Sequence, residues 1–124
     1  MKFRILVVDD EPLIRRMTTL LLEHLGYDVC CAEDALEAVW VYDNAYRTGY
    51  VFSAVLMDLT IPNGGGVAAT DQIRKINADA LVIVSTGYAC DPAVEDFKRF
   101  GFSEVLVKPY GIQDLGAVLS RVCT

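Results

Sequence analysis

The sequence predicts an α/β fold in which five strands and five helices alternate as (βα)5 in a doubly wound parallel sheet. Short, continuous apolar runs alternate with amphipathic stretches along the chain, without an internal repeat or a low-complexity segment. Continuous apolar runs are typical of strands covered on both faces, and parallel strands require crossover helices between them. With 124 residues, the chain is long enough for one domain, residues 1–124, with a substantial core.

Three predicted strands and two predicted helices occupy the first half of the chain. Pro12 suits the first turn of a helix, because the N–H that proline lacks would have no partner there, and Gly26 is a typical helix end. Asp34 followed by Glu37 predicts a capping box, which opens a second helix that runs to about Gly49. The predicted strands cover residues 3–8, 27–31 and 54–57, and the predicted apolar stripes are Leu13, Met17, Leu20, Leu21 and Leu25 on the first helix and Ala35, Val39, Tyr42 and Tyr46 on the second.

Two strands and three helices are predicted in the second half. A turn at residues 62–66 precedes a helix over 67–77, and residues 81–84 form the most uniformly apolar strand. Asp91 and Pro92 suit the start of a helix that Gly101 closes. Residues 105–107 form the fifth strand, and the last helix carries a stripe of Ile112, Leu115, Val118, Leu119 and Val122.

The charge and hydropathy of the chain exclude several functions. The formal net charge is -6 and the pI about 4.6, so the surface repels phosphate backbones and direct binding of nucleic acid is not expected. No apolar run approaches the roughly 20 residues of a membrane helix, and the run before Asp9 is too short for a signal peptide. The acidic balance instead permits a site for a divalent cation.

The cysteines and the single histidine argue against a zinc site or a disulfide framework. No two cysteines form a CxxC pair, and His24 is far from all of them in sequence. His24 is expected to be a surface residue near a helix end. Reduced thiols in a cytoplasmic protein are the simpler interpretation of Cys30, Cys31, Cys90 and Cys123.

Charged and hydroxyl side chains follow four of the five predicted strands. Ligands of doubly wound folds bind beyond the carboxyl ends of the strands, so we expect these side chains to converge at one edge of the sheet. Like charges brought together there need a neutralising partner, for which a hard divalent cation is suited. The residues are Asp9 and Asp10 after the first strand, Asp58 after the third, Ser85 and Thr86 after the fourth, and Lys108 with Pro109 after the fifth.

This set of groups suits the handling of a phosphoryl group. Proteins usually hold Mg²⁺ by one or two carboxylates, and Mg²⁺ commonly accompanies phosphate oxygens. Lys108 supplies a compact positive charge and Thr86 a hydroxyl donor. A carboxylate can act as the nucleophile and form an acyl phosphate. Asp58 is best placed for that role, because it ends a central strand, whereas Asp9 and Asp10 lie together on the metal side.

Five motifs in register make the sequence resemble the response-regulator receiver family over residues 3–122. The resemblance implies the flavodoxin-like strand order 2-1-3-4-5. It also implies a switch and not an enzyme in its own right, used in two-component signal transduction. The motifs are Asp9-Asp10-Glu11-Pro12, Met57-Asp58-Leu59-Thr60-Ile61-Pro62, Gly66, Ser85-Thr86-Gly87 and Lys108-Pro109-Tyr110.

The resemblance assigns a phosphoacceptor and a metal site. Asp58 would accept the phosphoryl group from a histidine kinase or a phosphotransfer domain. Asp10, Asp58 and the backbone carbonyl of Thr60 would ligate Mg²⁺, with Mn²⁺ as an alternative, and Asp9 would act through water. A downstream protein partner would respond to the phosphorylated state; the sequence does not name it.

The resemblance also assigns a switch and shows departures from the family. Lys108 would contact the phosphoryl group, Thr86 would swing toward it, and the Lys108–Pro109 bond would be cis. Val105 stands where the family often has an aromatic residue whose rotamer follows the switch threonine. The glycine run at residues 64–66 suggests a mobile loop, and Tyr88 occupies a position that tunes the lifetime of the phosphoryl group.

Several interpretations stay open from the sequence alone. The motifs look most like receivers attached to hybrid sensor histidine kinases, and a stand-alone response regulator is the alternative. A small Mg²⁺-dependent phosphatase that forms an aspartyl phosphate and a flavodoxin-type binding module are alternatives of other classes. Trp40 lies off the apolar stripe of its helix and is expected to be exposed, either as a scattered surface aromatic or as a partner contact.

Overall fold

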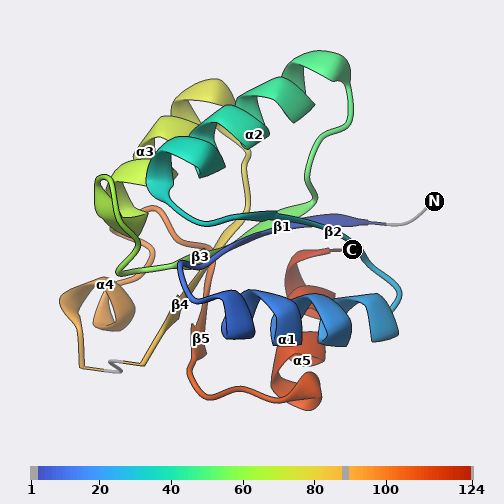
Figure 1. Ribbon diagram of the computed structural model, residues 1–124. Helices are drawn as coiled ribbons and strands as arrows, with labels where there is room; N and C mark the ends of the chain where they lie inside the picture. The colour runs from blue at the N-terminus through green and yellow to red at the C-terminus, as the bar shows by residue number, and fades with distance from the viewer. Residues whose placement is uncertain (1–2, 88–89, 124) are drawn as a thin grey trace.

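The computed structural model describes residues 3–87 and 90–123, which form alternating strands and helices (Figure 1). The strands are β1 (Arg4–Val8), β2 (Asp28–Ala32), β3 (Ala54–Asp58), β4 (Val82–Thr86) and β5 (Glu104–Val107). The helices are α1 (Pro12–His24), α2 (Ala35–Thr48), α3 (Gly65–Ile76), α4 (Pro92–Glu95) and α5 (Ile112–Val122).

All five strands are parallel and lie in the order β2-β1-β3-β4-β5, which confirms the predicted fold class and strand order. Helices α2 and α3 cover one face of the sheet, and α1 and α5 cover the other (Figure 1). Alternate residues of β1 serve the two faces: Leu6 and Val8 belong to the core under α2 and α3, whereas Ile5 and Val7 belong to the core over α1 and α5. Two buried faces explain why the strands read as continuous apolar runs.

The predicted apolar stripe of α1 is wrong at four of its five positions; the exception is Leu21, which is partly buried and packs against the core. Leu13 is 81% and Leu20 58% exposed, and Met17 is exposed as well, whereas Thr18 and Leu22 are buried against the sheet. A threonine fits this core because its hydroxyl lies 2.7 Å from the hydroxyl of buried Tyr110, so both polar groups keep a partner. Hydrophobicity alone therefore selected the wrong face of the helix.

Two further predictions about helices need correction. On α2, Ala35 and Tyr42 are buried as predicted, and Val39 is partly buried against the core. Tyr46 is exposed, whereas Ala38 and Ala45, which lay outside the predicted stripe, are buried. The helix after Asp91 was expected to continue to Gly101 but ends at Glu95. Hydrogen-bonded turns follow, in which the N–H of Gly101 donates to the carbonyl of Lys98 at 3.1 Å, and they lead Phe102 into the core.

Candidate functional site

The structure brings the predicted site residues to one edge of the sheet. Asp58 is the last residue of β3 and Thr86 the last of β4, and both are buried. Lys108 follows β5, where its backbone N–H donates to the carbonyl of Thr86 at 2.8 Å. Asp9 and Asp10 follow β1, so residues up to 99 positions apart share one site.

Three carboxylates in this site are close enough to share a cation. Asp9, Asp10 and Asp58 each offer one oxygen, and these oxygens all lie within 4.8 Å of one another. Asp9 and Asp58 are buried and Asp10 is exposed, so the group opens to solvent on one side. Carboxylate oxygens are the donors that Mg²⁺ prefers, and an open side leaves room for its water ligands. The donor set therefore fits a hard divalent cation.

Lys108 lies between two of these carboxylates. Its Nζ is 2.7 Å from Oδ2 of Asp9 and 3.6 Å from Oδ2 of Asp58. Burial alone would lower the pKa of Lys108, but the hydrogen bond to Asp9 and the charge of Asp58 together raise it. The lysine is therefore a fixed positive charge placed directly beside the carboxylate that the sequence indicates as a nucleophile.

The environment of Asp58 opposes its ionisation. Burial raises the pKa of Asp58, the ammonium of Lys108 lowers it by less, and the charge of Asp9 raises it further. The backbone N–H of Thr60 donates to Oδ1 of Asp58 at 3.4 Å, a long and weak bond. The protein alone therefore does not fully stabilise the negative charge of ionised Asp58. A bound cation would supply the missing stabilisation.

We expect the metal-free chain to become more stable when Asp58 is replaced by Asn. Because the pKa of Asp58 is raised, the folded chain holds this proton more tightly than the unfolded chain, and stability falls as pH rises from the ordinary value of 3.8 through the raised pKa. At neutral pH the variant should melt a few degrees higher, as about 1 kcal/mol would produce in a domain of this size. Thermal melts in EDTA at about pH 4 and pH 7.5 test the sign, since a gain that does not grow with pH contradicts it.

The loop after β3 holds its shape through a close approach of two backbone segments. A Cβ on Gly66 would lie 2.6 Å from the carbonyl oxygen of Asp58, a distance that side chains do not reach. The N–H of Gly66 instead donates to the carbonyl of Leu59 at 2.9 Å. Further along the loop, Asn63 donates from its side chain to the carboxylate of Asp34 at 3.1 Å. The loop beside Asp58 is therefore tied to the start of α2.

Sequence reasoning missed Arg15 as a part of this site. Its Nη1 donates to the backbone carbonyl of Asp9 at 2.7 Å, and its Nη2 lies 3.9 Å from Glu33. The residue fixes the β1–α1 loop that carries the acidic pair. The available signal was its position in the first turn of a helix that starts directly after Asp9 and Asp10. A long side chain at that position, six residues after Asp9, can reach back to the acidic pair.

The expectation for Tyr88 concerns a position outside the described residues.

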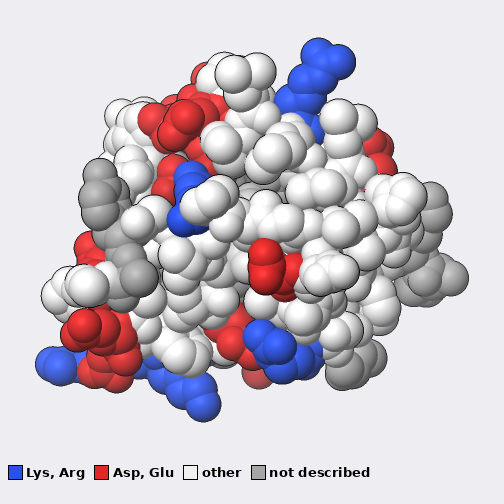
Figure 2. All heavy atoms as spheres, turned by 90° about the horizontal axis from the view of Figure 1, so that it is seen from below, with Lys and Arg blue, Asp and Glu red and all other residues white. Residues whose placement is uncertain are grey.

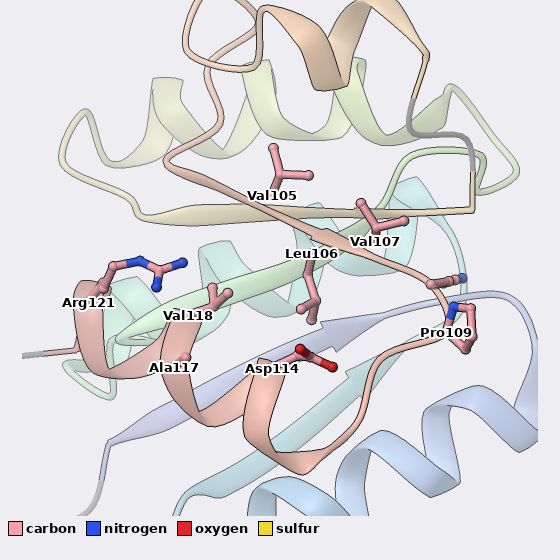
Figure 3. A pocket seen from close by; sticks show the side chains of 9 residues that line it. Val105, Leu106, Val107, Pro109, Asp114, Ala117, Val118 and Arg121 are labelled. Atoms are coloured by element: carbon pink, nitrogen blue, oxygen red, sulfur yellow. The ribbon is translucent and has the colours of Figure 1, made fainter.

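A groove of about 580 Å³ runs from this site along β5 and α5 (Figure 3). Leu106 points toward α5, whereas Val105 and Val107 point to the other side of the strand (Figure 3). Val105 is half-buried and packs against the core under α2 and α3. The Lys108–Pro109 bond at the end of the groove is cis, as the resemblance implies.

Comparisons with known proteins agree with this geometry. The sensor kinase/phosphatase CqsS of Vibrio cholerae is 36% identical over 122 residues, which are 96% of this chain and 17% of CqsS. The receiver domain of a sensor histidine kinase from Pseudomonas aeruginosa, solved with a magnesium ion in its active-site cleft, has a TM-score of 0.87 at 27% identity, covering 99% of this chain and 98% of that domain. The response regulator TrrA of Thermotoga maritima, solved in complex with Mg²⁺ and BeF, has a TM-score of 0.81 at 31% identity, covering 98% and 99% of the two chains.

The extent of the match decides what these similarities show. The chain spans only 17–24% of the length of the first curated relatives that it matches, so they share this domain and extend well beyond it. The family model for the response regulator receiver domain matches residues 5–120 of this chain. That range is nearly the whole chain and includes every strand-end residue described above. The chain, with its (βα)5 fold and the acidic edge that Lys108 bridges, therefore belongs to the response regulator receiver domain family.

Proposed function

We propose that this chain is a phosphoacceptor switch in two-component signalling that takes a phosphoryl group on Asp58. The observation that carries the proposal is the place of the Asp58 carboxylate, buried at the end of a central strand, 3.6 Å from the ammonium of Lys108 and within 4.8 Å of two further carboxylates. No helix in the described part of the chain has both the length and the apolar character that crossing a membrane requires. The proposed location is the cytoplasm.

The proposed reaction transfers a phosphoryl group between two side chains. An oxygen of Asp58 attacks phosphorus, the bond between phosphorus and the donor's imidazole nitrogen breaks, and that nitrogen keeps the electron pair. Asp10, Asp58 and the carbonyl of Thr60 would hold Mg²⁺, with Asp9 acting through water; when bound, the ion neutralises charge on the phosphoryl oxygens. Lys108 would release Asp9 and turn to a phosphoryl oxygen, to which its three N–H donors are suited.

The response to phosphorylation is proposed to begin at Thr86. Its hydroxyl belongs to a buried residue at the end of β4, beside the strand that carries Asp58. A movement of this side chain toward the new phosphoryl oxygens would change the neighbouring surface of α4, β5 and α5. Partners that bind the two states with different affinities would then read the change.

Replacement of Asp10 by Asn should weaken Mg²⁺ binding by tenfold or more, because it removes one proposed ligand from an exposed edge of the site. Titration of the shift in melting temperature with MgCl₂ measures this, since a ligand that binds only the folded chain stabilises it according to its concentration. Asp71→Asn, an exposed acid on α3, is the matched control and should leave the titration unchanged. Equal curves for Asp10→Asn and the parent would remove Asp10 from the metal site.

The donor is proposed to dock on the exposed apolar side chains of α1. This helix starts directly after the acidic pair, and Leu13, Met17 and Leu20 repeat along its outer surface. Figure 2 shows the face of the molecule formed by α1 and α5, where uncharged residues cover most of the surface, with an acidic residue near the centre and other charged residues distributed over the face and its edges. A partner that delivers a phosphoryl group to Asp58 must cover this edge of the molecule.

Leu13→Ala should therefore slow phosphoryl transfer from a phosphorylated histidine phosphotransfer domain by about tenfold, the effect of losing a well-placed interface side chain. Transfer from acetyl phosphate, which needs no docking surface, should keep its rate. Leu36→Ala is the control, since Leu36 is also a highly exposed leucine, 69% against 81% for Leu13, but lies on α2. Equal losses with both phosphoryl donors would place Leu13 in the reaction site and not in docking.

A place within a hybrid histidine kinase is the favoured context, and a stand-alone response regulator is the alternative. The similarity to CqsS and to the receiver domain of a sensor histidine kinase supports the first context, and the similarity to TrrA is compatible with the second. The coding sequence on either side of this segment decides between them. The family assignment gives no support to a phosphatase that acts on a small substrate.

A further inference from the structure

We propose that the outer surface of α2 is a docking site for a basic amphipathic helix of a partner protein. The proposal rests on the shape and charge of α2 and not on phosphorylation of Asp58. Leu36 is 69% and Trp40 70% exposed, and residues four apart on a helix are surface neighbours. Adjoining large apolar side chains that stay exposed indicate an interaction surface, whereas scattered ones do not.

Hollows flank this ridge of Leu36 and Trp40 on both sides. One of about 260 Å³ lies between α2, β2 and the segment that leads to β3, with Trp40 and Tyr50 at its mouth and Cys30 and Phe52 among its lining. Another, of about 180 Å³, lies between α2 and α3 and includes Leu36. A ridge with a groove on each side is the surface that a second helix fits, by placing its own i, i+3 and i+4 side chains in the grooves.

The far side of the larger hollow is held in place before any partner binds. Tyr50 is 68% exposed, yet the guanidinium of Arg4 lies 5.6 Å from its ring centroid and 4.8 Å from that of Phe52. Arg4 also donates to the backbone carbonyl of Tyr50 and, at 3.7 Å, to the sulfur of Cys30. A surface that is already ordered loses less conformational entropy on binding, which favours docking here.

The charge around the ridge selects the class of partner. Residues 33–48 hold four acidic side chains and one arginine, Arg47, which is highly exposed and pairs with Asp43 at 3.1 Å. Arg4, which lines the larger hollow, adds one positive charge from outside this segment, so acidic side chains still outnumber basic ones around the ridge. Arg15 lies 3.9 Å from Glu33, at the start of this segment, and compensates one further acid weakly. A second copy of the chain would oppose like charges, and anionic lipid or nucleic acid would meet the same repulsion. A helix with lysine or arginine beside its apolar stripe is complementary.

The probe for this site is a peptide of about 18 residues made only of leucine and lysine in an amphipathic helical pattern. Trp40 is the only tryptophan of the chain, so its fluorescence reports contact at the ridge directly. We expect a saturable blue shift with the lysine peptide and none with a leucine–glutamate peptide of the same pattern. The absence of a shift with the lysine peptide, or an equal shift with both peptides, would overturn the proposal.

Variants locate the binding, with the anisotropy of a labelled lysine peptide as the readout. Leu36→Ala and Trp40→Ala should each weaken binding by about thirtyfold, as for an anchor residue, and Glu37→Lys should weaken it through charge. Leu25→Ala, directly after α1, is the matched control, an exposed leucine that belongs to neither docking surface, and should bind like the parent. A loss with Leu25→Ala as large as that with Leu36→Ala means non-specific attraction and rejects the site.

The competing occupants are separate outcomes of the same fluorescence experiment. A Trp40 shift that depends on the concentration of the chain alone would indicate self-association. A shift with phosphatidylserine vesicles would indicate a lipid surface. Either result would replace the proposed partner. Uptake of a phosphoryl group by Asp58 is measured independently, so its failure would leave this proposal unaffected.

Discussion

Treatment with acetyl phosphate and Mg²⁺ should add one phosphoryl group to the chain and none to Asp58→Asn. The loss should be complete, because the amide of asparagine is not a nucleophile for phosphorus and the two other clustered acids do not take over. Asp9 is already engaged, by Lys108 at 2.7 Å and by the N–H of Glu11 at 3.0 Å, and Asp10 lies exposed at the rim. Intact mass before and after the reaction measures the outcome.

Controls separate the failure of the site from failure of the protein. Asp71→Asn should be phosphorylated like the parent, and EDTA should prevent the mass gain in both. Asp58→Asn must remain folded, which its expected gain in melting temperature would demonstrate. A mass gain in Asp58→Asn equal to that of the parent would move the acceptor to another residue and contradict the proposed function.

Replacement of Lys108 by Ala should slow phosphoryl transfer from acetyl phosphate by about a hundredfold. A fixed charge beside the reacting group typically contributes an effect of this size, because it stabilises the charge that develops on the phosphoryl oxygens. The ammonium is fixed in advance by Asp9, only 3.6 Å from the oxygen of Asp58. The rate is followed by intact mass over time at a saturating concentration of MgCl₂.

Metal binding distinguishes this role of Lys108 from a structural one. Because Lys108 is a cation and not a ligand, its removal should leave the affinity for Mg²⁺ intact or increase it. Lys108→Arg keeps the charge but not the compact shape, and should recover only part of the rate. An unchanged rate in Lys108→Ala would exclude the lysine from the reaction. A loss of rate together with a loss of Mg²⁺ affinity would show that it supports the site structurally.

The sequence predicted the fold and the composition of the site because both depend on local patterns. Runs such as residues 81–84 are apolar on both faces of the chain and have few alternatives to a buried parallel strand. Once the strands are parallel, the residues that follow them must meet at one edge. Asp58, Thr86 and Lys108 were therefore placed together without any knowledge of distances between them.

Contacts between distant segments could not be predicted in this way. The buried face of α1 includes Thr18, whose hydrogen-bond partner Tyr110 lies 92 positions away in the sequence. Arg15 contributes to the site through the backbone of Asp9, and only the path of the β1–α1 loop makes that contact available. In both examples a polar side chain is held by a hydrogen-bond partner. A pattern of hydrophobic residues carries no information about such partners.

Each strand from β2 onward pairs with a strand that precedes it in the chain: β2 and β3 with β1, β4 with β3, and β5 with β4. During synthesis the sheet can therefore assemble in the order in which a ribosome delivers the strands. After β3 emerges, its outer edge has no partner until β4 follows, although every residue of β3 is buried in the finished domain. The half-made chain exposes the unpaired N–H and C=O groups of this edge next to apolar side chains, a combination that favours aggregation.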